Sequence, residues 1–77
     1  GIRVNAVAPG AIDTPMTGAV TKDKKRLAHV HNGIAMKRFG TAKEIADAVF
    51  YLASDNATYA TGSVLAVDGG LTLMRGY

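Results

Sequence analysis

The stretch IRVNAVAPG, residues 2–10, decides the fold of this 77-residue chain. Its apolar residues recur at every second position and several of them are β-branched, which predicts a β-strand over Ile2–Ala8. Pro9 and Gly10 then end the strand, because proline has no N–H to donate to a sheet and glycine tolerates a positive φ. We therefore expect the chain to leave the sheet there and to continue as a loop over Ala11–Thr17.

A second strand is predicted near the other end of the sequence. The run SVLAV, residues 63–67, is almost wholly apolar, as is typical of parallel strands with both faces covered. The DGG that follows, residues 68–70, predicts a turn held by the Asp68 side chain. Two strands alone do not make a stable sheet. Both strands are therefore expected to belong to a larger parallel α/β sheet, with further strands beside them.

A polar helix is predicted after the first loop, over Thr21–Ala35. Apolar residues three and four positions apart give it a single apolar stripe, formed by Leu27, Val30 and Ile34. The order strand, loop, helix, helix, strand is then a right-handed β-α-β crossover with an extra helical insert.

The second helix is the clearest element of the sequence. Thr41 and Glu44 form a T-x-x-E capping box, which predicts a helix from Ala42 to about Ser54. Two adjoining apolar faces follow from the spacing, one with Ile45, Val49, Leu52 and Ala53, the other with Ala42, Ala46, Phe50 and Ala53. One sheet cannot cover so wide a surface, so we expect a contact with another subunit or another part of the chain.

Composition and charge limit the partners. The chain has no cysteine, which excludes disulfides and thiolate zinc sites and fits a cytoplasmic protein. The net charge is +3, and the basic run at residues 22–26, KDKKR, is typical of a solvated helix face. No nucleic acid is expected, because the run lacks interleaved aromatic residues, although an anion site there remains an alternative. No apolar run approaches the ~18 residues of a membrane span, so no membrane is expected.

No metal site or acid/base pair is predicted. His29 and His31 lie two positions apart on a predicted helix, where they point to different sides. The acidic residues show no recognisable pairing either.

The loop after the first strand is the candidate ligand site. In open parallel sheets, ligands bind beyond the carboxyl ends of the strands, and Pro9–Thr14 lies at such an end. Gly10 would let a ligand approach the backbone closely, and the loop N–H groups and the Thr14 hydroxyl can donate to a carboxamide or a phosphate. A plain strand-ending turn is the alternative.

Three segments carry a resemblance to a known family. They are IRVNAVAPGAIDTPM at 2–16, RFGTAKEIADAVFYLASD at 38–55 and YATGSVLAVDGG at 59–70. In this order and at this spacing they resemble the short-chain dehydrogenase/reductase family. The resemblance implies an α/β fold in which residues 1–77 form the C-terminal part of a Rossmann-type doubly wound parallel sheet, within one dinucleotide-binding domain.

The resemblance also implies roles for single residues. Pro9 and Gly10 would line the nicotinamide end of NAD or NADP. Ile12 would meet the nicotinamide carboxamide through its backbone, and Thr14 would hydrogen-bond the carboxamide or the pyrophosphate. Asn5 would be structural and join the strand to its neighbours.

Two further regions receive roles in the same way. The family has a variable substrate lid at 17–37, flanked by Met16 and Met36, which could touch substrate or simply pack in the loop. The helix and strand within 41–67 commonly pair with a twin in the family, which implies a homodimer or homotetramer.

The catalytic part of the family pattern is missing from these 77 residues. The family uses a Tyr-x-x-x-Lys pair and a glycine-rich phosphate loop, whereas Tyr51 is followed four positions on by Asp55 and Tyr59 by Ser63. No catalytic residue is therefore expected here, and the remainder of the same polypeptide would supply them. The whole enzyme would move hydride between NAD(P) and a small alcohol or carbonyl substrate that the sequence does not identify. The alternative is a non-catalytic assembly module derived from that fold.

Overall fold

The computed structural model describes residues 1–15, 18 and 22–74 of the chain. Within these ranges the elements, in chain order, are β1 (Ala6–Pro9), β2 (Ile12–Asp13), α2 (Lys24–Gly33), β3 (Gly40–Thr41), α3 (Ala42–Ala53), the 3-10 helix η2 (Asp55–Ala57), β4 (Val64–Val67) and α4 (Leu71–Met74). None of the helices in the described ranges is long and apolar enough to cross a membrane.

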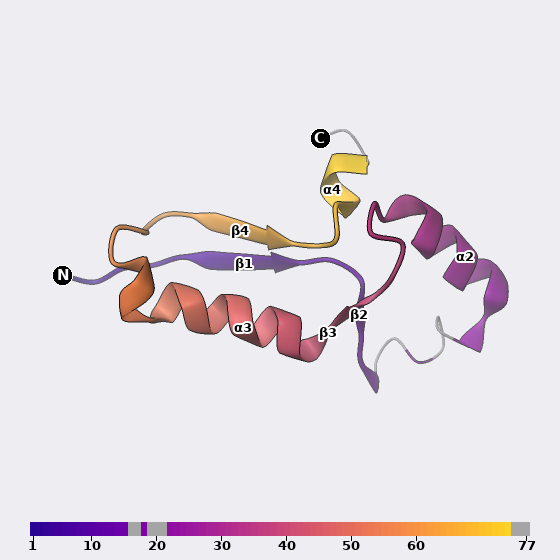
Figure 1. Ribbon diagram of the computed structural model, residues 1–77, viewed down its shortest axis with the longest axis horizontal. Helices are drawn as coiled ribbons and strands as arrows, with labels where there is room; N and C mark the ends of the chain where they lie inside the picture. Colours follow the sequence, from indigo (N-terminus) through magenta and orange to yellow (C-terminus); the bar gives the residue numbers. More distant parts are fainter. Residues whose placement is uncertain (16–17, 19–21, 75–77) are drawn as a thin grey trace.

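The two predicted strands pair with each other in parallel. Ala6 lies opposite Val64, and Pro9 lies opposite Val67. Figure 1 shows β1 and β4 side by side, with α3 running back along them from the carboxyl ends of the strands to their amino ends. This confirms the α/β architecture and the crossover between the strands.

Strand β1 differs from its predicted range at both ends. It begins at Ala6 instead of Ile2, because the pairing before it is only partly made by the backbone. The Val4 carbonyl accepts from Gly62 N at 2.7 Å, but the Val4 N–H donates to the Thr61 side chain, at Oγ1 and 3.1 Å. The strand also includes Pro9, which was predicted to lie just outside. Pro9 is tolerated because it is the last strand residue, and the ladder resumes with Gly10 N donating to the Val67 carbonyl at 3.1 Å.

Asn5 and Arg3 join the start of β1 to the segment before β4. Asn5 Nδ2 donates to the Ala60 carbonyl at 2.9 Å and Asn5 Oδ1 accepts from Ser63 N at 3.0 Å, which confirms its predicted structural role. The Arg3 guanidinium donates to the carbonyls of Leu52 and Ser54 at the end of α3, and to that of Ala60 after η2. Carbonyls at a helix end lack helical partners, so a cation satisfies them well.

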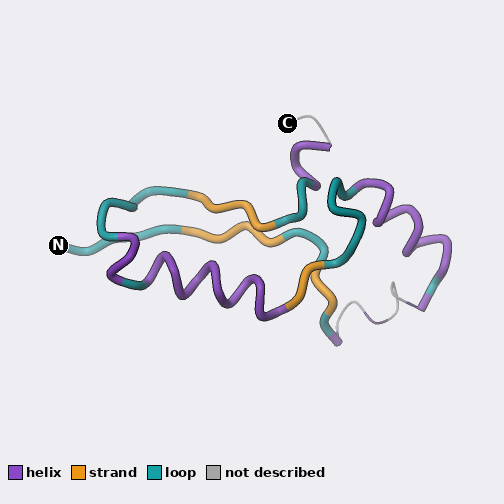
Figure 2. The backbone as a smooth tube through the Cα atoms, viewed as in Figure 1, coloured by secondary structure: helices purple, strands orange, loops and turns teal. Residues whose placement is uncertain are grey.

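A second parallel pair was not predicted. β2 and β3 are two residues each, with Ile12 opposite Gly40 and Asp13 opposite Thr41. Both lie in segments that the sequence predicted as loop or irregular structure. Figure 2 shows these short strands together where the chain after β1 meets the chain before α3. The pair fixes the loop after β1 to the start of α3.

Helix α3 has the predicted capping box. Thr41 Oγ1 accepts from Glu44 N at 3.1 Å, and Glu44 Oε1 accepts from Thr41 N at 2.9 Å. The helix contacts both β1 and β4. Its half-buried apolar residues are Ile45, Ala48 and Leu52. Val49, predicted to share that face, is instead 51% exposed, and Phe50 is 74% exposed. A wide apolar surface of α3 is therefore uncovered within the described residues.

Helix α2 is shorter than predicted, and the residue after its end, Ile34, is the least exposed of the buried hydrophobic residues in the described ranges. Asp23 caps its start by accepting from Lys25 N and Arg26 N. Ile34, predicted to lie within the helix, is its C-cap residue in extended backbone and is only 1% exposed. The buried hydrophobic residues in the described ranges are Ile34 and Ala57, and both lie outside the strands. Both faces of the β1–β4 sheet were predicted to be covered, but the described residues do not bury the strands. The further strands that would lie beside β1 and β4 stay a prediction.

Candidate functional site

The loop after β1 lies where the carboxyl ends of both parallel strands meet. Figure 1 shows β2, β3, α4 and the end of α2 gathered at this end of the sheet. Pro9 is exposed there, whereas Gly10, Ile12 and Thr14 are half-buried. The structure thus brings the four residues predicted to bind the cofactor to one end of the sheet.

Gly10 makes a close contact that was not predicted. Its tolerance of a positive φ is not used, because the described residues with positive φ are Lys37, Gly62, Gly69 and Gly70. A Cβ at Gly10 would instead lie 2.7 Å from both Cα and Cβ of Asp68. The close approach at Gly10 is therefore to the protein's own chain after β4, and any side chain there would push the two segments apart.

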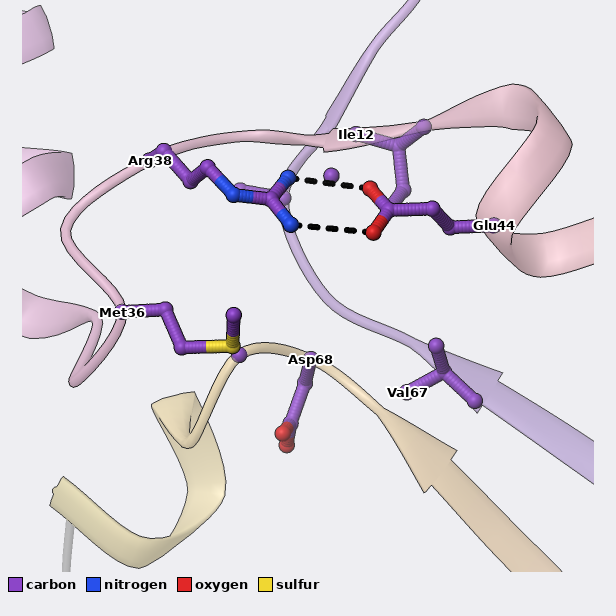
Figure 3. A pocket seen from close by; sticks show the side chains of 9 residues that line it. Ile12, Met36, Arg38, Glu44, Val67 and Asp68 are labelled. Carbon is purple, nitrogen blue, oxygen red and sulfur yellow. Dashed lines mark hydrogen bonds and ion pairs between the residues drawn. The ribbon is translucent and has the colours of Figure 1, made fainter.

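A small, mainly apolar cavity of about 90 Å³ lies beside this loop. It brings together Ile12, from the predicted cofactor loop, and Met36, from the predicted lid (Figure 3). Met16, the other predicted lid contact, lies outside the described residues. The full lining is Ala11, Ile12, Met36, Arg38, Gly40, Glu44, Val67, Asp68 and Gly69.

An ion pair forms one wall of this cavity. The Arg38 guanidinium donates through Nη1 and Nη2 to Glu44 Oε1 and Oε2, at 2.9 Å each (Figure 3). These hydrogen bonds from Arg38, followed by the one from the Thr41 backbone, lower the pKa of Glu44 to about 2, and the same bond to Glu44 raises the pKa of Arg38. Both groups therefore stay charged and paired at neutral pH. Sequence reasoning found Glu44 as a cap but missed Arg38, since no local spacing rule links residues six positions apart across a helix start.

Asp68 holds the turn after β4, as predicted, and also starts α4. Its Oδ1 accepts from Gly70 N at 2.9 Å, while Oδ2 accepts from Thr72 N at 3.1 Å and from Thr72 Oγ1 at 2.6 Å. The Thr72 hydroxyl, followed by the backbone N–H groups, lowers the pKa of the Asp68 carboxyl.

The turn at Asp68–Gly70 also packs against the end of the predicted lid, residues 34–36. Met36 N donates to the Gly69 carbonyl at 2.9 Å. A Cβ at Gly69 would lie 2.9 Å from Ile34 Cγ2, and one at Gly70 would lie 2.6 Å from the Ala35 Cβ. Since both glycines also have positive φ, no other residue fits this turn without strain.

Tyr51 and Tyr59 lie at the opposite end of the sheet from the loop. Tyr51 is near the end of α3 and Tyr59 follows η2, so both stand toward the amino ends of the strands, opposite the loop (Figure 1). On α2, His29 is exposed and the His31 ring meets the edge of Phe39 at 5.6 Å between centroids. Across the described part of the chain, no three His, Cys, Asp or Glu side chains cluster as metal ligands would.

Comparison with known proteins decides the family. A family model described as enoyl-(acyl carrier protein) reductase matches residues 1–72. The chain belongs to the short-chain dehydrogenase/reductase family. Its parallel α/β arrangement is accordingly part of the Rossmann fold of these enzymes, as the sequence predicted.

Curated members of the short-chain dehydrogenase/reductase family are similar over nearly the whole chain. It is 55% identical over 73 residues to glucose 1-dehydrogenase of Gluconobacter oxydans, covering 95% of this chain and 27% of that protein. It is 46% identical over 72 residues to 3-oxoacyl-(acyl-carrier-protein) reductase FabG of Thermotoga maritima, covering 94% and 28%. The chain therefore spans less than a third of the length of these relatives.

Solved structures of the family give the same result. A protein assigned as a 2-deoxy-D-gluconate 3-dehydrogenase from Agrobacterium tumefaciens, with bound NADP, matches with a TM-score of 0.91 and 41% identity, over 95% of this chain and 30% of that one. A 4-hydroxyisoleucine dehydrogenase complexed with NADH matches with a TM-score of 0.90 and 33% identity, over 94% and 30%.

Proposed function

We propose that this chain is the C-terminal segment of an oxidoreductase that transfers hydride between NAD or NADP and a small alcohol or carbonyl substrate. The observation that carries the proposal is the position of the PGAIDT loop, residues 9–14. In a chain of this family, the loop lies where two parallel strands, β1 and β4, both have their carboxyl ends. Relatives named as dehydrogenases and reductases, and family structures that hold NADP and NADH, support it.

The residues of the loop fit the nicotinamide end of such a cofactor. Its carboxamide needs hydrogen-bond donors and acceptors, which the loop backbone and the hydroxyl of the half-buried residue Thr14 would supply. Exposed Pro9 would place a rigid apolar surface beside the ring, and the Ile12 backbone would meet the carboxamide. Gly10 lies against Asp68 and so fixes the loop. When bound, the nicotinamide would give or take the hydride; the chain's own part is to bind and orient it.

The other regions would complete the site from outside the loop. Residues 17–37 would form the substrate lid, with Met16 and Met36 toward the substrate. Met36 is exposed and also lines the cavity beside the loop, which supports a contact of this kind. The acid/base tyrosine and its lysine would come from the remainder of the polypeptide. The cytoplasmic location stays a prediction.

The helix and strand within 41–67 would form a subunit interface in a homodimer or homotetramer. The exposed Phe50 on α3 and Val64 on β4 support this, because large apolar residues left in water favour a covering partner. The alternative of a non-catalytic assembly module uses the same surface but requires no cofactor.

Cofactor binding by the full-length protein separates the two functions. NADH and NADPH are titrated against wild type and Thr14→Val, with nicotinamide fluorescence as the signal. Loss of one neutral hydrogen bond should weaken binding by roughly threefold to tenfold. Thr58→Val is the matched control, since Thr58 is exposed and follows η2 at the far end of the sheet. Wild-type protein that assembles but binds neither cofactor would instead support the assembly module.

A further inference from the structure

We propose that Gly40 is a positioning residue for the cofactor loop: the absence of its side chain leaves the space in which the end of Ile12 lies. Gly40 belongs to β3 and pairs with Ile12 of β2. The proposal rests on the proposed function, because the loop matters for the reaction only if it holds the nicotinamide.

The contact between the two residues is very close. A Cβ on Gly40 would lie 2.8 Å from Ile12 Cδ1, well inside the 3.5–4.0 Å at which carbon atoms attract each other. The next atoms, Glu44 Oε1 and the Ala11 carbonyl oxygen, would be 3.8 and 3.9 Å away, at ordinary contact distance. A methyl group at position 40 would thus collide with the end of Ile12 and with nothing else nearby.

Backbone strain does not explain a glycine at this position. Among the described residues the glycines with positive φ are Gly62, Gly69 and Gly70, so an alanine can adopt the backbone of Gly40. The effect of Gly40→Ala should therefore come from Ile12 alone.

Of the two segments in contact, the loop that carries Ile12 should move more easily than the segment that carries Gly40. Gly40 is followed directly by the Thr41–Glu44 capping box, and Glu44 is also held by Arg38, so the start of α3 is fixed from both directions. β2 is held to β3 along only two residues. Ile12 is β-branched and stiff at χ1, so within the side chain only rotation about χ2 can move Cδ1 toward the cavity shown in Figure 3. We expect this rotation to relieve part of the collision, and the Ile12 backbone to move away from β3 for the rest.

The first test needs no cofactor. Hydrogen exchange of the loop, read in peptides that cover residues 10–15, is compared in the full-length protein for wild type, Gly40→Ala and Gly40→Ala with Ile12→Val. Valine lacks Cδ1, the atom in collision. We expect at least threefold faster exchange in Gly40→Ala and recovery in the double variant. Exchange equal to wild type in Gly40→Ala would mean that Ile12 simply turns into the cavity, and failure of Ile12→Val to restore it would mean that the collision is not the cause. Either result would overturn the proposal.

The second test links the loop to the cofactor. In the same variants, the Kd for NADH or NADPH should rise roughly threefold to tenfold in Gly40→Ala, as for loss of one hydrogen bond, and should recover with Ile12→Val. Gly33→Ala controls for the added methyl, because its nearest neighbour would be Leu71 Cδ1 at an ordinary 3.8 Å. Faster loop exchange with an unchanged Kd would overturn the positioning role. If wild type bound no cofactor, the proposed function would fail, and hydrogen exchange alone would decide whether Gly40 positions the loop.

Discussion

Truncation of Ile34 should be the most destabilising single change in the core of this segment. Ile34 is 1% exposed and caps the end of α2, where its Cγ2 lies against the backbone of Gly69. Ile→Ala in a core costs about 2–5 kcal/mol of unfolding free energy, depending on how far the site collapses. Collapse is limited here, because Gly69 has no side chain to move and the turn is fixed by positive φ and by Asp68. We therefore expect about 3–4 kcal/mol for Ile34→Ala, in the upper part of that range.

The assay is urea unfolding of the full-length protein followed by circular dichroism. Ile34→Val removes one methylene and should cost about 1 kcal/mol, which gives a graded series at one position. Leu73→Ala is the surface control: Leu73 is 81% exposed, so its loss should stay within about 0.5 kcal/mol. If Ile34→Ala lowered the unfolding free energy no more than Leu73→Ala, the packing of Ile34 against the turn after β4 would not contribute to stability as argued.

Three further predictions concern assembly, backbone strain and pH. Phe50→Glu places a charge on the exposed face of α3 and should reduce oligomer size in gel filtration; unchanged assembly would count against an interface there. Lys37→Gly should stabilise the protein by roughly 1 kcal/mol in urea unfolding, because the φ of 57° at Lys37 is unfavourable for any residue with a Cβ, and a loss of stability would contradict this. The pKa of Glu44 is lowered to about 2 from 4.5, so its contribution to stability is complete above pH 4.5 and is lost as pH falls toward 2. The difference in Tm between wild type and Glu44→Gln should therefore shrink from pH 7 to pH 2.5, and a constant difference would show that the Arg38 pair is unimportant.

The strands and the main helix could be predicted because their signals are local. Alternation in residues 2–8 and the apolar run at 63–67 gave the parallel pair, and the T-x-x-E capping box gave the first residue of α3. Asn5 and Asp68 were also placed correctly, since their roles depend on short polar side chains beside strand ends and turns. Each of these features shows within a few residues of sequence.

The features that were missed depend on contacts between distant segments. β2 and β3 are too short to show any period, and they exist because two separate loops meet. The contact of Gly10 with Asp68 was not predicted, because the two residues are far apart in the sequence. Ile34 was placed inside the α2 stripe by its spacing, although it belongs to the packing around the turn after β4. The roles of Pro9, Gly10, Ile12 and Thr14 toward a cofactor stay predictions.

The parallel pairing of β1 with β4 has a consequence for how the chain is made. The hydrogen bond between Asn5 and Ser63 joins residues 58 positions apart, and the β1–β4 ladder lies just beyond it. During synthesis β1 therefore emerges before β4, and its edge toward β4 stays unpaired in that interval. Intermediates with an unpaired strand edge aggregate readily, and pairing between residues far apart in the sequence forms slowly. Within this segment, exposure to aggregation should consequently be greatest in the interval between synthesis of β1 and release of β4.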